Sequence, residues 1–378
     1  MWILLSLLNI FFAYLAEIHF CRNRQISICA LLCIVIVNTI ILGFRDFGVG
    51  TDTLAYVKDY FECAGNLHDF ADLMEQEFYD KGYLLLAWMS RLFSDDPQAL
   101  LLFTELFIIS FMMLGVYEAR KVLRYNVMWF MIFFVLLYQH ETINLMRQFC
   151  SMSILFYGYS LLLQKKSKSY LLCQLIAFFF HSSSILFAII PVFQYLSNTD
   201  SKYRYRVPVG LFLFLLLTYF FYYTFIVYFQ ALHIISGDYA YRYGTSKTFA
   251  AEEVGSLGLI KDSIITMSLL MIVYAARKGK SIPRDIIYMV SVLVVFNFML
   301  SSMRTIMVYF FRLGYYMGLI MIIYLSAVIQ SCKKRNFIFY SGLYIFLIIT
   351  VMAAYRSYGF SPEGWVNNVY KSKILGIE

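Results

Sequence analysis

Apolar stretches of roughly twenty residues follow one another along the chain, and short polar or charged spacers separate them. A helix of that length crosses the ~30 Å hydrocarbon core of a bilayer and satisfies its own backbone hydrogen bonds there. The stretches are continuously apolar and do not alternate as the strands of a membrane barrel do. The pattern therefore predicts an all-α, polytopic integral membrane protein with about twelve transmembrane helices.

The spacers delimit the predicted spans. The stretch 169–196 is interrupted by His181 and three serines and is flanked by basic residues on both sides, so we expect a helical hairpin around His181. One long span is the alternative, and it would reverse the topology of everything that follows. The predicted spans are 2–20, 26–44, 98–117, 126–138, 143–163, two short helices within 169–196, 208–232, 259–276, 286–301, 307–330 and 337–355.

The charge pattern predicts which ends of the spans face the cytoplasm. The net charge is +8, and most of the Lys and Arg residues are clustered in spacers between spans. Such clusters are typical of cytoplasmic loops, so the positive charge reports topology and does not suggest a nucleic-acid partner. The clusters lie at 22–24, 120–124, 165–168, 202–206, 277–284 and 333–335.

Two longer loops are expected outside, at about 45–97 and 235–258. Between Asp46 and Asp80 the first loop carries nine acidic residues and one lysine, a composition that disfavours the cytoplasmic face. Within it, the apolar stretch 82–93 is too short to cross the membrane and is expected to lie in the interface. We expect residues 1–378 to form a single transmembrane domain with both ends outside.

Metal and cofactor chemistry is not indicated. The seven cysteines have no paired metal-ligand spacing. The chain has no Walker-type glycine loop for a nucleotide and no Asp-x-Asp pair for a divalent ion. We therefore expect no metal site and no cofactor.

Four arginines lie outside the basic spacers, at the outer ends of predicted spans: Arg45, Arg147, Arg304 and Arg312. An arginine at that depth is costly unless it faces a cavity or has a partner. One interpretation is that they reach the lipid headgroups or pair with local acids such as Asp46 and Glu141. The other is that they bind one anion, and a lipid diphosphate suits several guanidinium groups because each grips phosphate oxygens with two donors.

Three residues are candidates for a general base. His181 lies deep within an apolar stretch, where it could equally be a turn residue satisfied by the backbone. Asp52, within Gly50-Thr51-Asp52-Thr53, could instead cap the helix that follows. Glu141, at the outer end of a span, is the weakest of the three.

Three segments together resemble the EpsG family of bacterial envelope polysaccharide proteins, which is related in role to the Wzy O-antigen polymerases. The first contains Arg45, Gly50-Thr51-Asp52-Thr53 and Tyr56. The second contains Asn144, Arg147 and Gln148, followed by the basic spacer at 165–168 and the stretch 177–183. The third contains Arg312 with Tyr315 and Tyr316. The family's late proline is not evident, so the choice between Arg304 and Arg312 stays open.

The resemblance implies a GT-C-like glycosyltransferase that works without a metal, for exopolysaccharide or O-antigen synthesis, on the outer face of the bacterial cytoplasmic (inner) membrane. The donor would be a growing glycan on undecaprenyl diphosphate and the acceptor a repeat unit on a second such carrier; a chain-length regulator is a further implied partner. The base would be His181, Asp52 or Glu141. The residues expected to bind diphosphate or sugar are Arg45, Arg147, Gln148, Arg304, Arg312, Thr51, Tyr56 and Tyr315.

Two alternatives share these features. A transporter or flippase for lipid-linked saccharides would also line its path with arginines, although its polar residues should extend through the full membrane depth. A ligase would use the same donor with a different acceptor.

Overall fold

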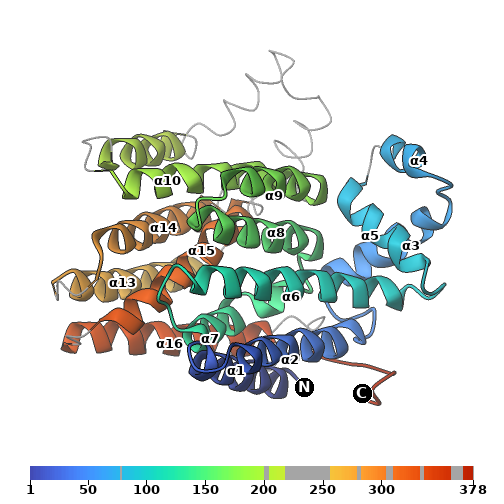
Figure 1. Ribbon diagram of the computed structural model, residues 1–378, viewed down its shortest axis with the longest axis horizontal. Coiled ribbons are helices and arrows are strands. Elements are labelled where there is room, and N and C mark those ends of the chain that lie inside the picture. Colours follow the sequence, from blue (N-terminus) through green and yellow to red (C-terminus); the bar gives the residue numbers. More distant parts are fainter. Residues whose placement is uncertain are drawn as a thin grey trace, which may run out of the picture. The chain divides into compact units, whose positions relative to one another are not determined.

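The predicted apolar stretches form the helices of the structure, a computed structural model that describes residues 1–76, 79–199, 204–217, 256–278, 282–303, 310–332, 336–358 and 369–377 (Figure 1). The elements of these residues are all helical, which confirms the all-α prediction. The chain divides into two compact units, Met1–Ala188 with Thr350–Glu378, and Ile189–Ile349. The prediction of a single transmembrane domain stays a prediction.

Long helices of the first unit pack in a row, each against the next. In Figure 1 this row runs from α1 to α9, and α7 (Val127–Leu137) packs against α1. The helices of the row are α1 (Trp2–His19), α2 (Arg24–Gly43), α6 (Gln98–Arg120), α8 (Met146–Leu163) and α9 (Ser167–Phe180).

Glycines lie at three consecutive interfaces of this row. A Cβ atom on Gly115 of α6 would lie 2.3 Å from the Phe156 ring of α8. Gly43 is similarly close to α6, and Gly158 is similarly close to α9. In a membrane, where the hydrophobic effect does not drive helices together, small residues allow the close packing that holds them.

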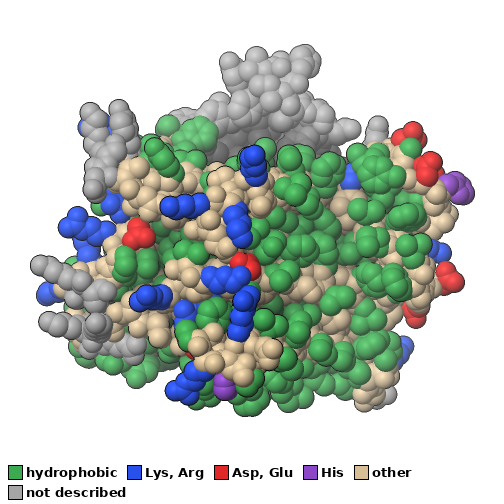
Figure 2. All heavy atoms as spheres, viewed as in Figure 1, with side chains coloured by type: hydrophobic (Ala, Val, Ile, Leu, Met, Phe, Trp, Pro, Cys, Tyr) green, Lys and Arg blue, Asp and Glu red, His purple; other side chains and the backbone are tan. Residues whose placement is uncertain are grey.

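The segment between α2 and α6 is itself folded into helices. The sequence predicted only the last of these, at 82–93. Acidic side chains gather over α3 and α4, as Figure 2 shows. The helices are η1 (Thr53–Val57), α3 (Lys58–Gly65), α4 (Phe70–Glu75) and α5 (Lys81–Arg91). Because α5 packs against α3, α6 and α9, this segment is joined to the membrane helices and is not a free loop.

The C-terminal residues pack against the end of α2. The Tyr370 hydroxyl donates to the carbonyl of Ile41 at 2.7 Å, and the Lys373 amide donates to Oδ1 of Asp46 at 2.9 Å. The Trp2 ring lies 5.9 Å from the Tyr370 ring, measured between centroids. Trp2 and Tyr370, near the two ends of the chain, therefore lie at the same end of this unit.

The second unit is organised around α14 (Arg284–Ser302). This helix packs against α13 (Ser256–Lys278), α15 (Phe310–Ser331) and α10 (Ile189–Ser197). The Tyr324 hydroxyl of α15 lies 2.6 Å from Oε1 of Gln194 on α10. Residues 204–217 are also helical. The last helix, α16 (Phe337–Ser357), begins in this unit and ends in the first.

Seven helices of the described residues are long and apolar enough to cross a membrane, so the chain is a polytopic membrane protein. They are α1, α2, α6, α13, α14, α15 and α16, and their bounds agree with the predicted spans to within a few residues. Shorter apolar helices occur at Val127–Leu137, Ser167–Phe180 and Ser182–Ser197. The total of about twelve stays a prediction, because most of the span at 208–232 and most of the loop at 235–258 lie outside the described residues.

The predicted interruption near His181 is present. Helix α9 ends at Phe180, His181 has extended backbone angles (φ −164°, ψ 122°), and the 3₁₀ helix η3 (Ser182–Ala188) follows. The reversal of direction expected for a hairpin stays a prediction, because α10 belongs to the other unit.

Basic spacers of the first unit meet at one end of its helices. The Arg120 guanidinium lies 3.1 Å from Glu17 of α1, which joins the first two spacers. Glu118 accepts hydrogen bonds from both Lys121 and Gln164, which brings the spacer at 165–168 to the same place. The part of the first loop from Asp46 to Asp80, which we call the acid-rich segment, follows the opposite end of α2. This separation is the one that the charge pattern predicted, and the assignment of the basic end to the cytoplasm stays a prediction.

Candidate functional site

Arg147 lies in the first turn of α8 and forms an ion pair with a residue of the acid-rich segment. Its Nη1 donates to Oδ2 of Asp80 at 2.8 Å and to the Tyr60 hydroxyl at 3.1 Å. The Tyr60 hydroxyl in turn accepts a hydrogen bond from the backbone N–H of Asp80 at 3.0 Å. The Arg147 side chain is 21% exposed and that of Asp80 is 23% exposed, so the pair is held by the protein and still reaches the surface.

His181 reaches the same carboxylate from α9. Its Nδ1 lies 3.5 Å from Oδ2 of Asp80, close enough for an electrostatic interaction but without hydrogen-bond geometry. Nδ1 is buried, whereas the side chain as a whole is 29% exposed. Asp80 thus lies between the guanidinium and the imidazole.

Gly82 permits this approach of α5 to α9. A Cβ at Gly82 would lie 2.6 Å from Cδ2 of Phe180 and 2.9 Å from its backbone nitrogen. Both distances are shorter than any real side chain tolerates. Gly82 lies two residues after Asp80, and Phe180 directly precedes His181. The absence of a side chain at Gly82 therefore allows the Asp80 carboxylate and the His181 imidazole to come close together.

Two tyrosines cover the Arg147 guanidinium. Its Cζ lies 4.0 Å from the centroid of the Tyr56 ring and 5.7 Å from that of the Tyr60 ring, and cations bind favourably over such faces. Burial raises the pKa of Tyr60, Arg147 lowers it to a smaller extent and Asp80 raises it. The phenol therefore keeps its proton at neutral pH.

The arrangement suits an anion and a proton transfer. Nε of Arg147 is buried and has no hydrogen-bond acceptor among the described residues, whereas the side chain as a whole is 21% exposed, so a ligand can reach part of the guanidinium. A carboxylate beside a histidine holds the ring and stabilises the imidazolium that forms when the ring takes a proton. We call Tyr56, Tyr60, Asp80, Arg147 and His181 the α8 cluster.

Arg45 has a different environment from Arg147. It is fully buried, and its Nη1 lies 2.8 Å from Oε1 of Glu105, a fully buried acid of α6. Its Nε donates to the Thr53 hydroxyl at 3.2 Å, and its Nη1 also donates to the carbonyl of Leu42. Nη2 lies 3.0 Å from the sulfur of Met146, the neighbour of Arg147. Arg45 thus fixes the start of the first loop to α6 and α8.

Thr51 joins the first loop to the beginning of α8. Its backbone N–H donates to Oδ1 of Asn144 at 3.0 Å, and its hydroxyl donates to the Asn144 carbonyl at 3.3 Å. Gly50, at φ +93°, would place a Cβ 2.6 Å from the carbonyl oxygen of Ile143, so this turn requires glycine. Asp52 follows, is 9% exposed, and acts electrostatically on Arg147.

The remaining predicted residues have other positions. Gln148 is buried within α8. Glu141, in the turn η2 (Gln139–Glu141), has its Oε1 3.2 Å from Nε2 of His140. Arg312 and Tyr315 lie on α15 in the second unit, at a helical spacing of three that puts them on one face. Arg304 lies outside the described residues.

Sequence reasoning missed Asp80, Tyr60 and Glu105. Glu105 had a clear signal, because a lone acid within an apolar span needs a cation as its partner. Asp80 had a weaker signal: it is the last of the nine acids of the acid-rich segment, and an apolar helix follows it directly. Tyr60 had none, being one of 32 tyrosines. The local acids expected as partners, Asp46 and Glu141, have other partners in the structure.

Within the described part of the chain, no group of three His, Cys, Asp or Glu side chains could hold a metal ion. The comparison with protein families matches the model described as EpsG family to residues 28–367, most of the chain. No curated protein and no solved structure matches the chain.

Proposed function

The chain belongs to the EpsG family, whose members are Wzy-like polysaccharide polymerases, and on that basis we propose that it joins lipid-linked glycans on the outer face of the cytoplasmic membrane. The donor is a growing glycan on a polyprenyl diphosphate. The acceptor is a hydroxyl of a repeat unit on a second carrier. The α8 cluster is the site of this transfer.

The donor diphosphate binds at Arg147. Its Nη1 is held by Asp80 and Tyr60, and the Tyr56 ring covers its face, so the guanidinium has one orientation. The exposed part of the guanidinium then meets the phosphate oxygens. A positioned charge of this kind stabilises the negative charge that develops on the leaving diphosphate, so the leaving group needs neither a metal nor a proton.

His181 takes the proton of the attacking hydroxyl. The hydroxyl oxygen attacks the anomeric carbon of the donor sugar, and the bond from that carbon to the diphosphate oxygen breaks. The electron pair of the broken bond leaves with the lipid diphosphate, and the proton passes to Nε2 of His181. Asp80, 3.5 Å from Nδ1, favours the tautomer with its proton on Nδ1 and stabilises the imidazolium that results.

One observation carries this proposal. An arginine, a carboxylate and a histidine come from α8, the acid-rich segment and the end of α9, three separate parts of the chain, and they meet in a partly exposed group. Arg45 and Thr51 act indirectly, by fixing the first loop to α8. Asp52 and Glu141 are the competing candidates for the base.

The test uses the purified full-length chain in lipid nanodiscs with a single lipid-diphosphate-linked repeat unit as both donor and acceptor. The wild type is expected to form products of two and more repeats, resolved by mass spectrometry. Arg147→Ala and His181→Ala should each lower the initial rate about a hundredfold or more. The matched controls are Arg22→Ala and His68→Ala, because both residues are exposed and lie outside the α8 cluster.

Unchanged lipid-linked substrate from the wild type would contradict a polymerase and favour transport of the same substrate. If His181→Ala keeps the wild-type rate and either Asp52→Asn or Glu141→Gln loses most of it, the general base is Asp52 or Glu141, respectively. When a glycan acceptor without a lipid carrier is added to the same assay, transfer to that acceptor alone would identify a ligase.

A further inference from the structure

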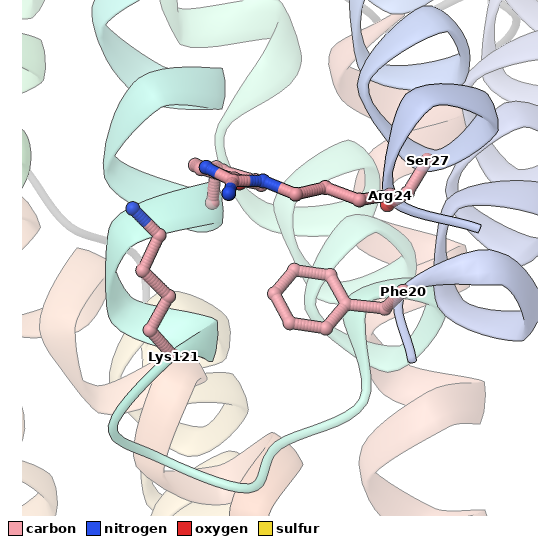
Figure 3. A pocket seen from close by; sticks show the side chains of 5 residues that line it. Phe20, Arg24, Ser27 and Lys121 are labelled. Atoms are coloured by element: carbon pink, nitrogen blue, oxygen red, sulfur yellow. The ribbon is translucent and has the colours of Figure 1, made fainter. Parts of the chain in front are cut away.

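A second group of cationic and aromatic side chains surrounds a pocket at the basic end of the first unit. The pocket has a volume of about 410 Å³. It is lined by Phe20, Arg24, Ser27, Tyr117 and Lys121, which come from the ends of α1, α2 and α6. Figure 3 shows Arg24 and Lys121 extending toward each other from opposite walls, with the Phe20 ring beside them.

The cations are held over aromatic faces. Nε of Arg24 donates to the Tyr117 hydroxyl, and its Cζ lies 5.5 Å from the centroid of the Tyr117 ring. Nζ of Lys121 lies 4.3 Å from the same ring. Cζ of Arg120 lies 5.0 Å from the centroid of the Phe20 ring, which also lines the pocket. Tyr117 therefore keeps the two cations of the pocket close together.

The charges near the pocket leave one positive charge unmatched. Lys121 pairs with Glu118, and Arg120 pairs with Glu17. Within the described residues, no carboxylate lies at salt-bridge distance from Arg24, whose partner is a neutral phenol. A single phosphodiester, with one negative charge, complements this surplus.

An exposed apolar stripe runs from the pocket along α2. The stripe continues from Arg24 at a spacing of four residues, so successive members are neighbours about 40° apart and the stripe winds gradually around the helix. Their exposed fractions are 36% for Ile28, 52% for Leu32, 55% for Ile36 and 42% for Ile40. A ligand with its anionic head in the pocket can therefore lay an acyl chain along α2.

We propose that this pocket binds the headgroup of an anionic phospholipid from the leaflet at the basic end of the helices. A basic pocket between membrane helices is suited to such headgroups, and each lysine or arginine near the surface contributes about 1 kcal/mol, a factor of about five in affinity. The occupant is a lipid and not a free phosphate, because the stripe adds apolar contact that a soluble anion cannot use.

Native mass spectrometry of the full-length protein in detergent tests this. The probes are phosphatidylglycerol, phosphatidylcholine with the same acyl chains, and glycerol 3-phosphate as the soluble headgroup. We expect phosphatidylglycerol to bind about fivefold or more tightly than phosphatidylcholine, and glycerol 3-phosphate to bind far more weakly. Arg24→Gln should remove the preference for phosphatidylglycerol, and Arg24→Lys should keep most of it.

Lys121→Gln provides an independent variant, because Lys121 is exposed and its loss leaves the negative charge of Glu118 without this cation. It should lower the affinity for phosphatidylglycerol about fivefold. The matched control is Lys168→Gln, an exposed lysine of the third basic spacer that does not line the pocket. An unchanged lipid preference in both pocket variants would overturn the proposal. Equal affinity for glycerol 3-phosphate and the lipid would also overturn it, in favour of a soluble anion.

Discussion

The guanidinium of Arg45 and the carboxylate of Glu105 form a salt bridge of 2.8 Å in which neither side chain has any exposed surface. The pair joins the end of α2 to a point about two turns inside α6. Arg45 was expected to bind diphosphate from its position in the sequence, and within the described residues its side chain contacts Thr53, the Leu42 carbonyl and Met146 as well as Glu105. Arg45 is therefore enclosed by protein, unlike Arg147, which we propose binds the substrate.

Removing one member of this pair is expected to destabilise the protein. A buried charge left without its partner costs about 3–5 kcal/mol, so Arg45→Ala and Glu105→Ala should each lower the unfolding temperature strongly in detergent. The double variant Arg45→Met, Glu105→Leu leaves no unpaired charge and should recover much of this loss. Wild-type stability for Arg45→Ala together with lost polymerisation would show that Arg45 acts on substrate instead.

Asp80→Asn is expected to lower the polymerisation rate by about a hundredfold or more while the protein stays folded. The amide removes the negative charge that orients and stabilises the His181 imidazolium, and a comparable change in a Ser-His-Asp triad lowers kcat by about 10⁴. Initial rates in nanodiscs measure the effect. The control is Asp59→Asn, because Asp59 belongs to the same acidic segment and accepts a hydrogen bond from Tyr79 that asparagine can also accept. Equal rates for the two variants would remove Asp80 from the mechanism.

Gly82→Ala should separate Asp80 from His181 without changing any group that reacts. The added Cβ would lie 2.6 Å from the Phe180 ring, so α5 or α9 must move, at a cost of about 1–3 kcal/mol. The rate should fall, and thermal unfolding should show a modest loss of stability. Gly48→Ala is the matched control, because nothing lies within 4 Å of a Cβ at Gly48. A Gly82→Ala protein with wild-type activity would argue against a requirement for this close approach.

Tyr56 should act through its ring and not through its hydroxyl. The ring lies 4.0 Å from Cζ of Arg147, and a cation over an aromatic face is worth about 0.5–2 kcal/mol. Tyr56→Phe should therefore keep nearly wild-type donor affinity, whereas Tyr56→Leu should weaken it by a few-fold to about thirtyfold. The apparent KM for the lipid-linked repeat measures this. Similar losses in both variants would assign the effect to the hydroxyl.

The class of the protein and most helix boundaries follow from the sequence alone. Continuous apolar stretches can satisfy their backbone groups in lipid only as helices, so α1, α2, α6 and α13 to α16 lie where the hydropathy predicts them. The same holds for the break at His181, where polar residues interrupt an apolar run. Arg147 and His181 were also singled out by residue type and depth, because charge near a membrane is costly unless it has a partner or a function, whereas Tyr56 was expected from the family resemblance.

Only the tertiary structure decided which partner each of these residues has. Arg45 and Arg147 look alike in sequence, yet one is enclosed with Glu105 and the other reaches the surface beside Asp80. That difference depends on contacts between residues 60 and 67 positions apart, brought together by the packing of α5 and α6 on their neighbours. Local hydropathy and charge are properties of a single stretch, so they predict the helices. The pairing of side chains depends on which helices pack together and at what depth, and it appears only in the folded chain.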